Sequence, residues 1–482
     1  MSNVRRGFII TLMSSNGMMV ISFIASLFIS RLLTPEEIGI FSVAYVFAGL
    51  LRTIREMGLG SYLVQETELT PLRIRTAFGI SLLISFACAL ILLALSAFAG
   101  RFYNEPRITD VLNIVAVGFF LVPFGATTMS LLRRDLRFGD IARIDLTSTV
   151  AQNACAVLLA WLGFGFMSLA WSALVGILTS VLGVLFYRPA GLPWKPSLSE
   201  WRRVLSFSSY VSGSSLLNFA HYSASDLLLG KVMGMEAVAY FNRAHGLSTI
   251  LGTVLNRAVS AVSLPYFAEQ NRIGTAFVQS WRNSTAILHT LTLPFFSTLA
   301  ISAPSAIPTL FGPQWGESIP ILQILCIAAA LDSPASLVRQ IMTAGGHVRT
   351  VMNLDLISLT LRVALIIYAA PFGLVAIAAT YAASSFILAV LRTLTLRRQI
   401  NFSVADLLYT YQWAAAPTLL VSVLSYFVQT AQLSNSIKLT IISLGCSSLW
   451  IFIITRGKSP LSSELRRLLQ KKPIQTSNNT DK

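Results

Sequence analysis

Long apolar stretches of about 20 residues recur along the whole chain and are separated by short polar turns. A helix that crosses a membrane needs about 20 predominantly apolar residues, because each residue advances a helix by only about 1.5 Å. Fourteen such stretches are present, so we predict an all-α integral membrane protein with about 14 transmembrane helices. The predicted spans are residues 8–30, 38–63, 76–99, 109–132, 144–163, 166–186, 206–229, 237–262, 284–311, 318–343, 351–369, 373–391, 413–430 and 436–455.

The composition agrees with a membrane protein and excludes a soluble one. Of the 482 residues, 54% are hydrophobic and 12% are charged, and the mean hydropathy is +0.69. A soluble domain carries about 25% charged residues, so this chain lacks the polar surface of a soluble enzyme or of a nucleic-acid-binding protein. The net charge of +16 is therefore assigned to loops at the membrane surface, where Lys and Arg accumulate on the cytoplasmic side.

The distribution of basic residues predicts the orientation of the chain. If the N-terminus is cytoplasmic, 25 of the 36 Lys and Arg residues fall in segments on the cytoplasmic side and 5 on the opposite side. Since positive charge marks cytoplasmic loops, we predict that both ends of the chain are cytoplasmic. Arg392 is assigned to one of these cytoplasmic loops. The remaining six basic residues lie inside predicted spans.

Two segments of the chain align without a gap at an offset of 200 residues. They are LFISRLLTPEEIGIFS (27–42) and LLLGKVMGMEAVAYFN (227–242), and each covers a turn between two predicted spans. An offset of six helices produces two parallel repeats, an arrangement found in many carriers. We therefore expect two six-helix lobes that enclose a substrate path. The expected domains are an N-lobe (1–190), a C-lobe (191–400), two further helices (401–456) and a cytoplasmic tail (457–482).

One of these segments also carries a resemblance to a known family. Residues 30–65, SRLLTPEEIGIFSVAYVFAGLLRTIREMGLGSYLVQ, and residues 309–325, TLFGPQWGESIPILQIL, resemble the Wzx-type oligosaccharide flippases of the polysaccharide transporter family. That family belongs to the multidrug/oligosaccharidyl-lipid/polysaccharide exporter superfamily. The first motif has an architectural alternative, because Thr34, Pro35 and Glu37 also form the capping box and first turn of a helix.

The resemblance implies a function. A polyprenyl-diphosphate-linked oligosaccharide repeat unit would be moved from the inner to the outer leaflet of a bacterial inner membrane by alternating access, for lipopolysaccharide or exopolysaccharide assembly. Such a flippase would act on lipid-linked oligosaccharide among membrane lipids, alongside a polysaccharide polymerase and chain-length machinery, with no nucleic acid involved. The resemblance also implies that an H⁺ or Na⁺ gradient drives transport.

Charged residues inside the predicted spans are the candidates for substrate contact. Each costs about 2.5–3.5 kcal/mol at the bilayer centre, so such residues usually face the interior of a bundle. Away from the ends of the spans, six are basic and three are acidic, which favours an anionic substrate because guanidinium groups bind phosphate oxygens in a bidentate fork. The candidates for binding diphosphate or glycan are Arg52, Arg55, Arg243, Arg257, Arg339 and Arg362, and those for ion coupling are Glu56, Asp226 and Asp332.

Some of these charges have a structural alternative. Glu56 lies four residues after Arg52, and Arg339 lies seven residues after Asp332, so each pair either forms an ion pair on one helix face or contacts substrate. Arg55, slightly to the cytoplasmic side of its span, is the strongest single candidate for an entering head group. The other three arginines either contact substrate or pair with Asp226 or backbone carbonyls. His221 and His245 either titrate near neutral pH or serve in packing.

Two other functions compete with the flippase. A multidrug cation antiporter would be expected to line its path with carboxylates, which a net positive interior disfavours. A membrane enzyme of glycan assembly would need a large soluble loop or a carboxylate cluster, and the sequence has no DxD, HExxH or GxxxxGK[ST] motif. We therefore expect no enzyme, no catalytic residue, no metal site and no cofactor beyond a coupling H⁺ or Na⁺. The four cysteines lie in apolar stretches and are expected to be unpaired.

Overall fold

The computed structural model describes residues 2–56, 59–188, 195–202, 219, 223, 225–252, 277–456 and 459–463. Within these ranges the chain is helical and contains no strand. The chain divides into two compact units, Met1–Ala239 and Tyr240–Lys482, which are described separately below.

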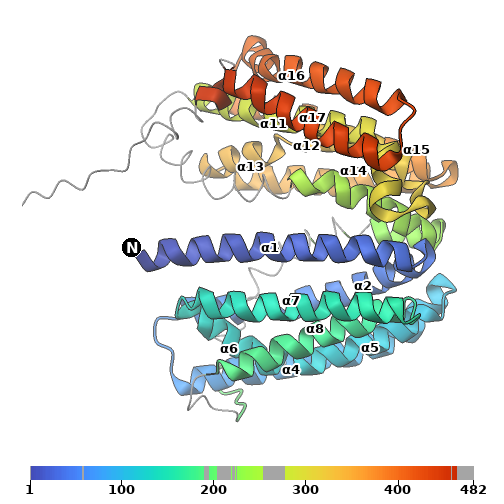
Figure 1. Ribbon diagram of the computed structural model, residues 1–482. Coiled ribbons are helices and arrows are strands. Elements are labelled where there is room, and N and C mark those ends of the chain that lie inside the picture. The colour runs from blue at the N-terminus through green and yellow to red at the C-terminus, as the bar shows by residue number, and fades with distance from the viewer. Residues whose placement is uncertain are drawn as a thin grey trace, which may run out of the picture. The chain divides into compact units, whose positions relative to one another are not determined.

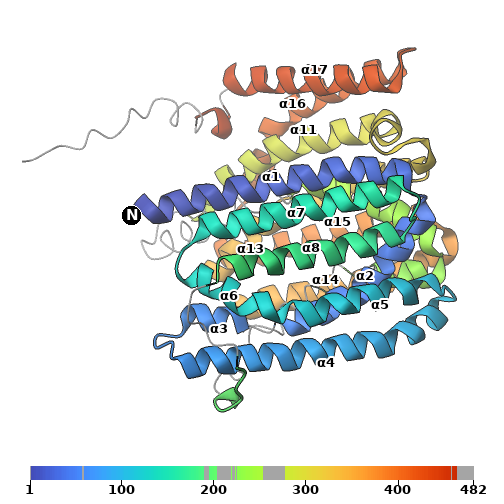
Figure 2. The same cartoon turned by 60° about the horizontal axis from the view of Figure 1, so that its bottom comes forward.

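The first unit is a helix bundle in which some packed neighbours are consecutive in sequence and others are far apart. Helix α1 packs on α7, α7 on α8, α8 on α5 and α5 on α4, and Figures 1 and 2 show these helices running alongside one another. Helices α2 and α6 add further contacts to α4, α5 and α8. The helices of this unit are α1 (Ser2–Leu32), α2 (Pro35–Arg55), α3 (Leu59–Gln65), α4 (Pro71–Tyr103), α5 (Arg107–Leu121), α6 (Pro123–Arg134), α7 (Phe138–Trp161) and α8 (Met167–Phe186), followed by helical residues 225–232 and the first turn of a further helix from 235.

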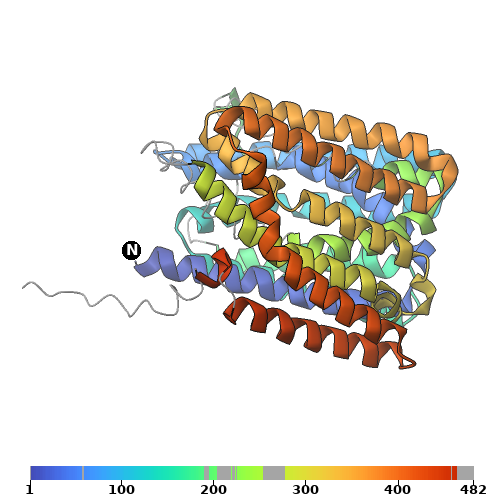
Figure 3. The same cartoon turned by 90° about the horizontal axis from the view of Figure 1, so that it is seen from above.

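The second unit is organised around its longest helix. Helix α11 packs against α12, α16 and α17, while α12 and α14 pack against α15. Figure 3 shows this part of the chain, coloured from yellow to red, with α16 crossing over α11. The helices are residues 240–252, α11 (Phe277–Phe311), η1 (Pro313–Trp315), α12 (Ser318–Asp332), α13 (Ala335–Ala344), α14 (Val348–Ala369), η2 (Ala370–Phe372), α15 (Leu374–Ile400), α16 (Val404–Thr430) and α17 (Asn435–Arg456).

The all-helical membrane architecture is confirmed, whereas the predicted number of spans is met only in part. Among the described residues, ten helices are long and apolar enough to cross a membrane, or eleven if the pair α5 and α6, bent by 54°, forms one span. Helix α7 covers the predicted span 144–163 but is not among these ten. The predicted spans 206–229 and 237–262 extend beyond the described residues, as does most of the tail 457–482.

Two helix starts follow directly from local sequence. At α2, the Glu37 N–H donates to Thr34 Oγ1 (3.3 Å) and the Thr34 N–H donates to the Glu37 carboxylate (2.9 Å), which completes the expected capping box. Ser403 and Asp406 form the same box at α16. The sequence predicts a short interfacial helix over 403–413 ahead of the span 413–430, whereas the structure has one continuous helix, Val404–Thr430.

The turn that the sequence repeat identified has the same fold in both copies. Helix α1 ends at Leu32 and α2 begins at Pro35, while residues 225–232 and the helix from 235 repeat this pattern 200 positions later. The aromatic pairs Phe41–Tyr45 and Phe241–His245 also correspond and are stacked at 5.4 and 5.9 Å.

The two copies of the turn meet inside the first unit. A Cβ atom added at Gly39 would lie 1.8 Å from the carbonyl oxygen of Met235, so only glycine permits this approach of the backbones. Tyr103 donates to the carbonyl of Leu227 (3.1 Å), and Lys231 bonds the carbonyl of Phe102. Residues 225–239 are thus fixed to α2 and to the end of α4.

An ion-pair cluster closes the same end of the first unit. Arg107, at the start of α5, bonds Glu36 of α2 and holds Glu105 with its Nε 2.7 Å from Oε1. These hydrogen bonds from Arg107 lower the pKa of the Glu105 carboxyl below its ordinary value. The turn between α4 and α5 is thereby tied to the start of α2.

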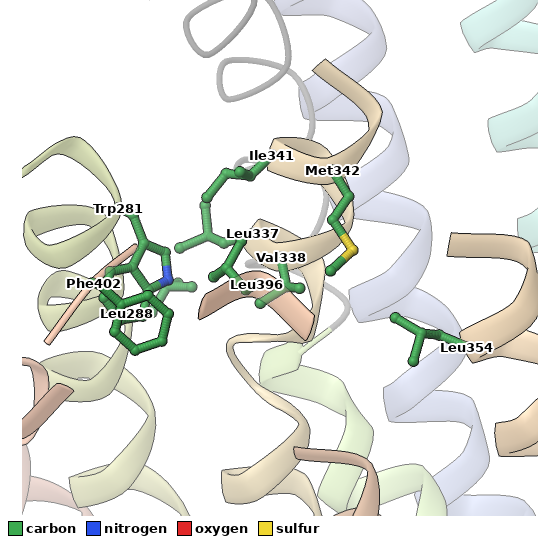
Figure 4. Close-up of a cluster of buried hydrophobic side chains, with 9 residues drawn as sticks. All are labelled: Trp281, Leu288, Leu337, Val338, Ile341, Met342, Leu354, Leu396 and Phe402. Atoms are coloured by element: carbon green, nitrogen blue, oxygen red, sulfur yellow. The ribbon is translucent and has the colours of Figure 1, made fainter. Parts of the chain in front are cut away.

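A buried apolar cluster joins several helices of the second unit. Trp281 of α11 stacks on Phe402 at 4.3 Å, ahead of α16, and the cluster continues onto α13, α14 and α15. Figure 4 shows its nine side chains, namely Trp281, Leu288, Leu337, Val338, Ile341, Met342, Leu354, Leu396 and Phe402. Because Leu396 lies one turn from Arg392 on α15, this core also fixes the charged residues described below.

The close approach at Gly39 predicts a large effect of a small substitution. Gly39→Ala forces Met235 away and should lower the free energy of unfolding by about 1–3 kcal/mol or more, as overpacking does. Thermal unfolding of the purified chain in detergent measures the change. Gly17→Ala is the matched control, since a Cβ there meets nothing within 4 Å and alanine favours a helix. Equal melting temperatures for the wild type and Gly39→Ala would contradict this packing.

The Glu105 cluster predicts a pH-dependent stability. The unfolded carboxyl has a pKa of about 4.3 and the folded one lies lower, so its contribution is complete above the unfolded pKa and is lost as the pH falls through the folded pKa. Glu105→Gln should cost about 1 kcal/mol at pH 7, a modest value because Arg107 stays partly exposed.

This difference should shrink in acid when melting is followed from pH 7 to pH 3. Glu68→Gln, which alters an exposed carboxylate of the same unit, should show no such trend. A Glu105→Gln deficit that is constant across the range would contradict the assignment.

Candidate functional site

Three charged side chains from three helices meet inside the second unit. Arg362 Nη2 lies 2.8 Å from Oδ2 of Asp332, and Arg392 Nη1 lies 3.1 Å from Oδ1. The hydroxyl of Ser385 donates to the same Oδ2 at 2.8 Å. Both carboxylate oxygens of Asp332 are therefore bonded to guanidinium groups.

Helix geometry explains how these residues come together. Ser385 and Arg392 are seven residues apart on α15 and so lie on one face, which packs against both α12 and α14. Asp332 is the last residue of α12, directly before the break at Ser333 and Pro334 that separates α12 from α13. Proline has no N–H and interrupts a helix, so the chain can turn at this point.

The cluster continues through an aromatic residue of the same helix face. Tyr381 precedes Ser385 by one turn, and its hydroxyl accepts a hydrogen bond of 2.7 Å from Arg362 Nη1. The Arg362 guanidinium also lies 4.2 Å from the centre of the Tyr381 ring, a cation–π distance. His245 Nε2 is 3.4 Å from the Tyr381 hydroxyl, and Phe241 stacks on His245.

The charges of this cluster do not cancel. Two arginines share one aspartate, so the three side chains carry a net charge of +1. Their side chains are 11% (Arg362), 16% (Arg392) and 27% (Asp332) exposed, and removing charged groups from water is costly unless each is paired. An excess positive charge in such surroundings attracts an anion, and guanidinium groups are suited to phosphate oxygens.

The first unit contains a smaller cluster at the end of α2. Arg55 pairs with Glu56 at 3.0 Å and is 12% exposed, while Glu56 is 63% exposed. Arg52 instead donates to the Tyr45 hydroxyl at 3.2 Å. The ion pair considered between Arg52 and Glu56 is thus wrong, because the neighbouring Arg55 reaches that carboxylate.

Arg52 and Arg362 have similar surroundings in their respective units. Each guanidinium donates to a tyrosine hydroxyl and lies over the ring of the same tyrosine. Tyr45 is the repeat counterpart of His245, which itself contacts Tyr381. An arginine held against a tyrosine is therefore a feature of both units.

The other predicted site residues lie apart from these clusters. Arg339 pairs with Asp355 at 2.7 Å, whereas Asp332 pairs with Arg362 and Arg392. Arg243 lies over the rings of Phe311 and Trp315, 5.3 and 5.0 Å from their centres.

One further predicted position lies within the described residues, and two lie outside them. Asp226 lies in the helical residues 225–232 of the first unit, next to the Leu227 carbonyl that binds Tyr103. Arg257 and His221 lie outside the described residues. Whether any of the predicted residues contacts substrate stays a prediction.

Sequence reasoning missed three members of the cluster in the second unit. Arg392 was assigned to a loop because the apolar stretch ends at residue 391, but α15 continues to Ile400. Tyr381 and Ser385 carry no formal charge, so a search for charged residues inside the spans does not find them. Their spacing of four residues, followed by seven to Arg392, is the signal that would have revealed a polar face.

The described part of the chain contains no group of three or more His, Cys, Asp or Glu residues that could hold a metal ion. The arrangement can bind an oxyanion through two guanidinium groups, with a tyrosine and a histidine close by. It contains no nucleophile paired with a base of the kind that hydrolytic enzymes use.

The comparisons with known proteins agree on one family. The family described as "Polysaccharide biosynthesis protein" matches residues 28–320. The chain is 23% identical over 329 residues to the lipopolysaccharide biosynthesis protein WzxC of Escherichia coli, covering 66% of this chain and 65% of WzxC. It is 26% identical over 326 residues to the succinoglycan biosynthesis transport protein ExoT of Rhizobium meliloti, covering 68% and 66%. The matched region thus spans slightly less than two thirds of each curated relative.

Solved structures show the same fold at low sequence identity. The lipid II flippase MurJ in an inward closed conformation matches with a TM-score of 0.76 at 12% identity, over 96% of this chain and 100% of MurJ. An inward-facing multidrug resistance MATE family transporter of the MOP superfamily matches with a TM-score of 0.64 at 16% identity, over 80% and 94%. The fold is therefore that of MurJ and MATE transporters.

The shared aspartate predicts an unequal response to three substitutions. Asp332→Ala leaves two guanidinium groups facing each other and should cost about 3–5 kcal/mol of unfolding free energy, as broken buried pairs do. Arg362→Ala and Arg392→Ala each leave Asp332 with one partner and should cost about 1–3 kcal/mol.

Thermal unfolding of the purified chain in detergent measures these differences. Arg398→Ala, on the exposed part of the same helix α15, is the control and should change stability by less than about 0.5 kcal/mol. A loss for Asp332→Ala no greater than that for either arginine variant would contradict the proposed charge balance.

Proposed function

Because the chain belongs to the polysaccharide biosynthesis protein family, we propose that it is a flippase for a lipid-linked glycan and not an enzyme. In this proposal the chain moves a polyprenyl-diphosphate-linked oligosaccharide repeat unit from the inner to the outer leaflet. The repeat unit then enters surface polysaccharide, lipopolysaccharide or exopolysaccharide assembly.

The observation that carries this proposal is the pair Arg362 and Arg392 around a single aspartate inside an apolar helix bundle. A transporter of cations would gain from an excess of carboxylates, whereas the reverse excess is found here. A diphosphate carries at least two negative charges and offers several oxygens to guanidinium groups. The anionic link between lipid and glycan is thus the part of the substrate that this cluster fits.

The comparisons support a flippase from two directions. WzxC and ExoT are named for lipopolysaccharide and succinoglycan biosynthesis, and MurJ is named as a flippase of lipid II. Transport by alternating access would then place the substrate path between the lobes 1–190 and 191–400. Residues Arg52, Arg55, Arg243, Arg257 and Arg339 remain proposed contacts along this path.

The setting of the transporter is also part of the proposal. The chain would lie in a bacterial inner membrane with both termini cytoplasmic, as the 25 to 5 distribution of basic residues favours. Polysaccharide polymerase and chain-length machinery would receive its product. An H⁺ or Na⁺ gradient would drive it, with Asp226, Asp332 and Glu56 as the proposed coupling groups.

A multidrug cation antiporter is the second candidate, because MATE transporters share the fold. The net positive charge of the cluster weighs against it. Discrimination between the two requires an experiment on the glycan itself.

The flippase proposal predicts a change in the pool of lipid-linked oligosaccharide. Cells that lack the protein should accumulate a complete repeat unit on the carrier lipid, because synthesis continues while export stops. Mass spectrometry of extracted lipids measures this pool and identifies the glycan. Wild-type protein and Arg398→Ala should return the pool to normal, whereas Arg362→Ala and Arg55→Ala should restore export at least about tenfold less well.

The alternatives give different results in the same cells. An unchanged pool together with intact surface polysaccharide would overturn the flippase in favour of drug efflux. An unpolymerised glycan already on the outer face would overturn it in favour of an enzyme of glycan assembly. Membrane levels of each variant, measured by immunoblot, separate loss of transport from loss of protein.

A further inference from the structure

The Asp332 carboxylate has the surroundings of a bound anion. Arg362 Nη2 and the Ser385 hydroxyl contact Oδ2, each at 2.8 Å, and Arg392 Nη1 contacts Oδ1 at 3.1 Å. Guanidinium groups and hydroxyls that converge from two different helices are the usual ligands of phosphate groups in proteins. Here the same donors surround a side chain of the protein.

The C-terminal end of α12 is an unfavourable position for the Asp332 carboxylate. It is the last residue of α12, where the helix dipole presents partial negative charge and disfavours a carboxylate. Pro334 interrupts the chain two residues later and separates α12 from α13. The carboxylate is therefore held in place by Arg362 and Arg392, at the junction between α12 and α13.

Exposure distinguishes the aspartate from its partners. The Asp332 side chain is 27% exposed, compared with 11% for Arg362 and 16% for Arg392, and Ser385 is buried. The carboxylate is therefore the most accessible charged group of the cluster. Displacement of that carboxylate would uncover donors already arranged for an anion.

We propose that the Asp332 carboxylate is an internal substitute for the diphosphate of the transported lipid and competes with it for Arg362 and Arg392. The inference rests on the proposed function and adds Arg392 as a diphosphate contact. A diphosphate carries at least two negative charges, whereas the Asp332 carboxylate carries one. When the diphosphate leaves, Asp332 returns, so the two guanidinium groups are not left without an anion in apolar surroundings.

The test removes the competing charge and keeps the shape of the side chain. Asp332→Asn is purified as the full chain in phosphatidylcholine nanodiscs and titrated with inorganic pyrophosphate by calorimetry. We expect the variant to bind pyrophosphate about tenfold or more tightly than the wild type, since the ligand no longer displaces a carboxylate. Addition of Arg362→Ala or Arg392→Ala should abolish the gain.

Asp355→Asn is the matched control. It removes the partner of Arg339, also at 2.7 Å in the second unit, and should leave pyrophosphate affinity unchanged. Asp332→Ser carries the same prediction and replaces the asparagine variant if that variant does not fold.

Three results would overturn the inference. They are equal or weaker pyrophosphate binding by both Asp332 variants, an equal gain in Asp355→Asn, and an equal gain for inorganic phosphate, which would remove the assignment to a diphosphate. Failure of the flippase proposal is distinguishable from these. An unchanged lipid-linked oligosaccharide pool would overturn the proposed substrate. It would leave intact the inference that Asp332 competes with pyrophosphate for the two arginines.

Discussion

A charged side chain inside an apolar helix bundle needs a partner, and this requirement determines much of the arrangement seen here. An uncompensated charge costs several kcal/mol, and the arginines of this protein have different kinds of partner. Arg55 bonds Glu56, Arg243 lies over Phe311 and Trp315, and Arg362 and Arg392 share Asp332. Of these solutions, the shared aspartate alone joins three helices, so it contributes to the fold and to the candidate site together.

Apolar packing fixes the positions of the helices that carry these charged side chains. The core around Trp281 and Phe402 holds α13 and the end of α15 in place (Figure 4), and Leu396 in this core is one turn from Arg392. In the first unit, the contact of Gly39 with Met235 sets the position of residues 225–239. Charged groups at these positions are therefore presented from rigid surroundings, which reduces the entropy that is lost when a ligand binds.

The sequence predicted the parts of the structure that depend on local chemistry. The capping box at Thr34 and Glu37, the helix–turn–helix at 27–42 and 227–242 and the apolar spans all follow from residues close together in the chain. The pairing of Asp332 could not be predicted in this way. Arg339 pairs with Asp355, and the partners of Asp332 are 30 and 60 residues away in the sequence. Arg392 was also hidden, because hydropathy alone ended its helix too early.

A carrier of an anionic lipid has to release its substrate as well as bind it. Two arginines without a counter-charge would bind a diphosphate tightly, and their empty state would be destabilised by repulsion between them. A single carboxylate lowers the energy of that empty state and leaves a net charge of +1 to favour binding. The affinity for the substrate then depends on the free-energy difference between the arginines paired with Asp332 and the arginines paired with the diphosphate. A conformational change can reverse a small difference of this kind. The position of Asp332 beside a helix break, with its arginines on two other helices, is what such an exchange of partners requires.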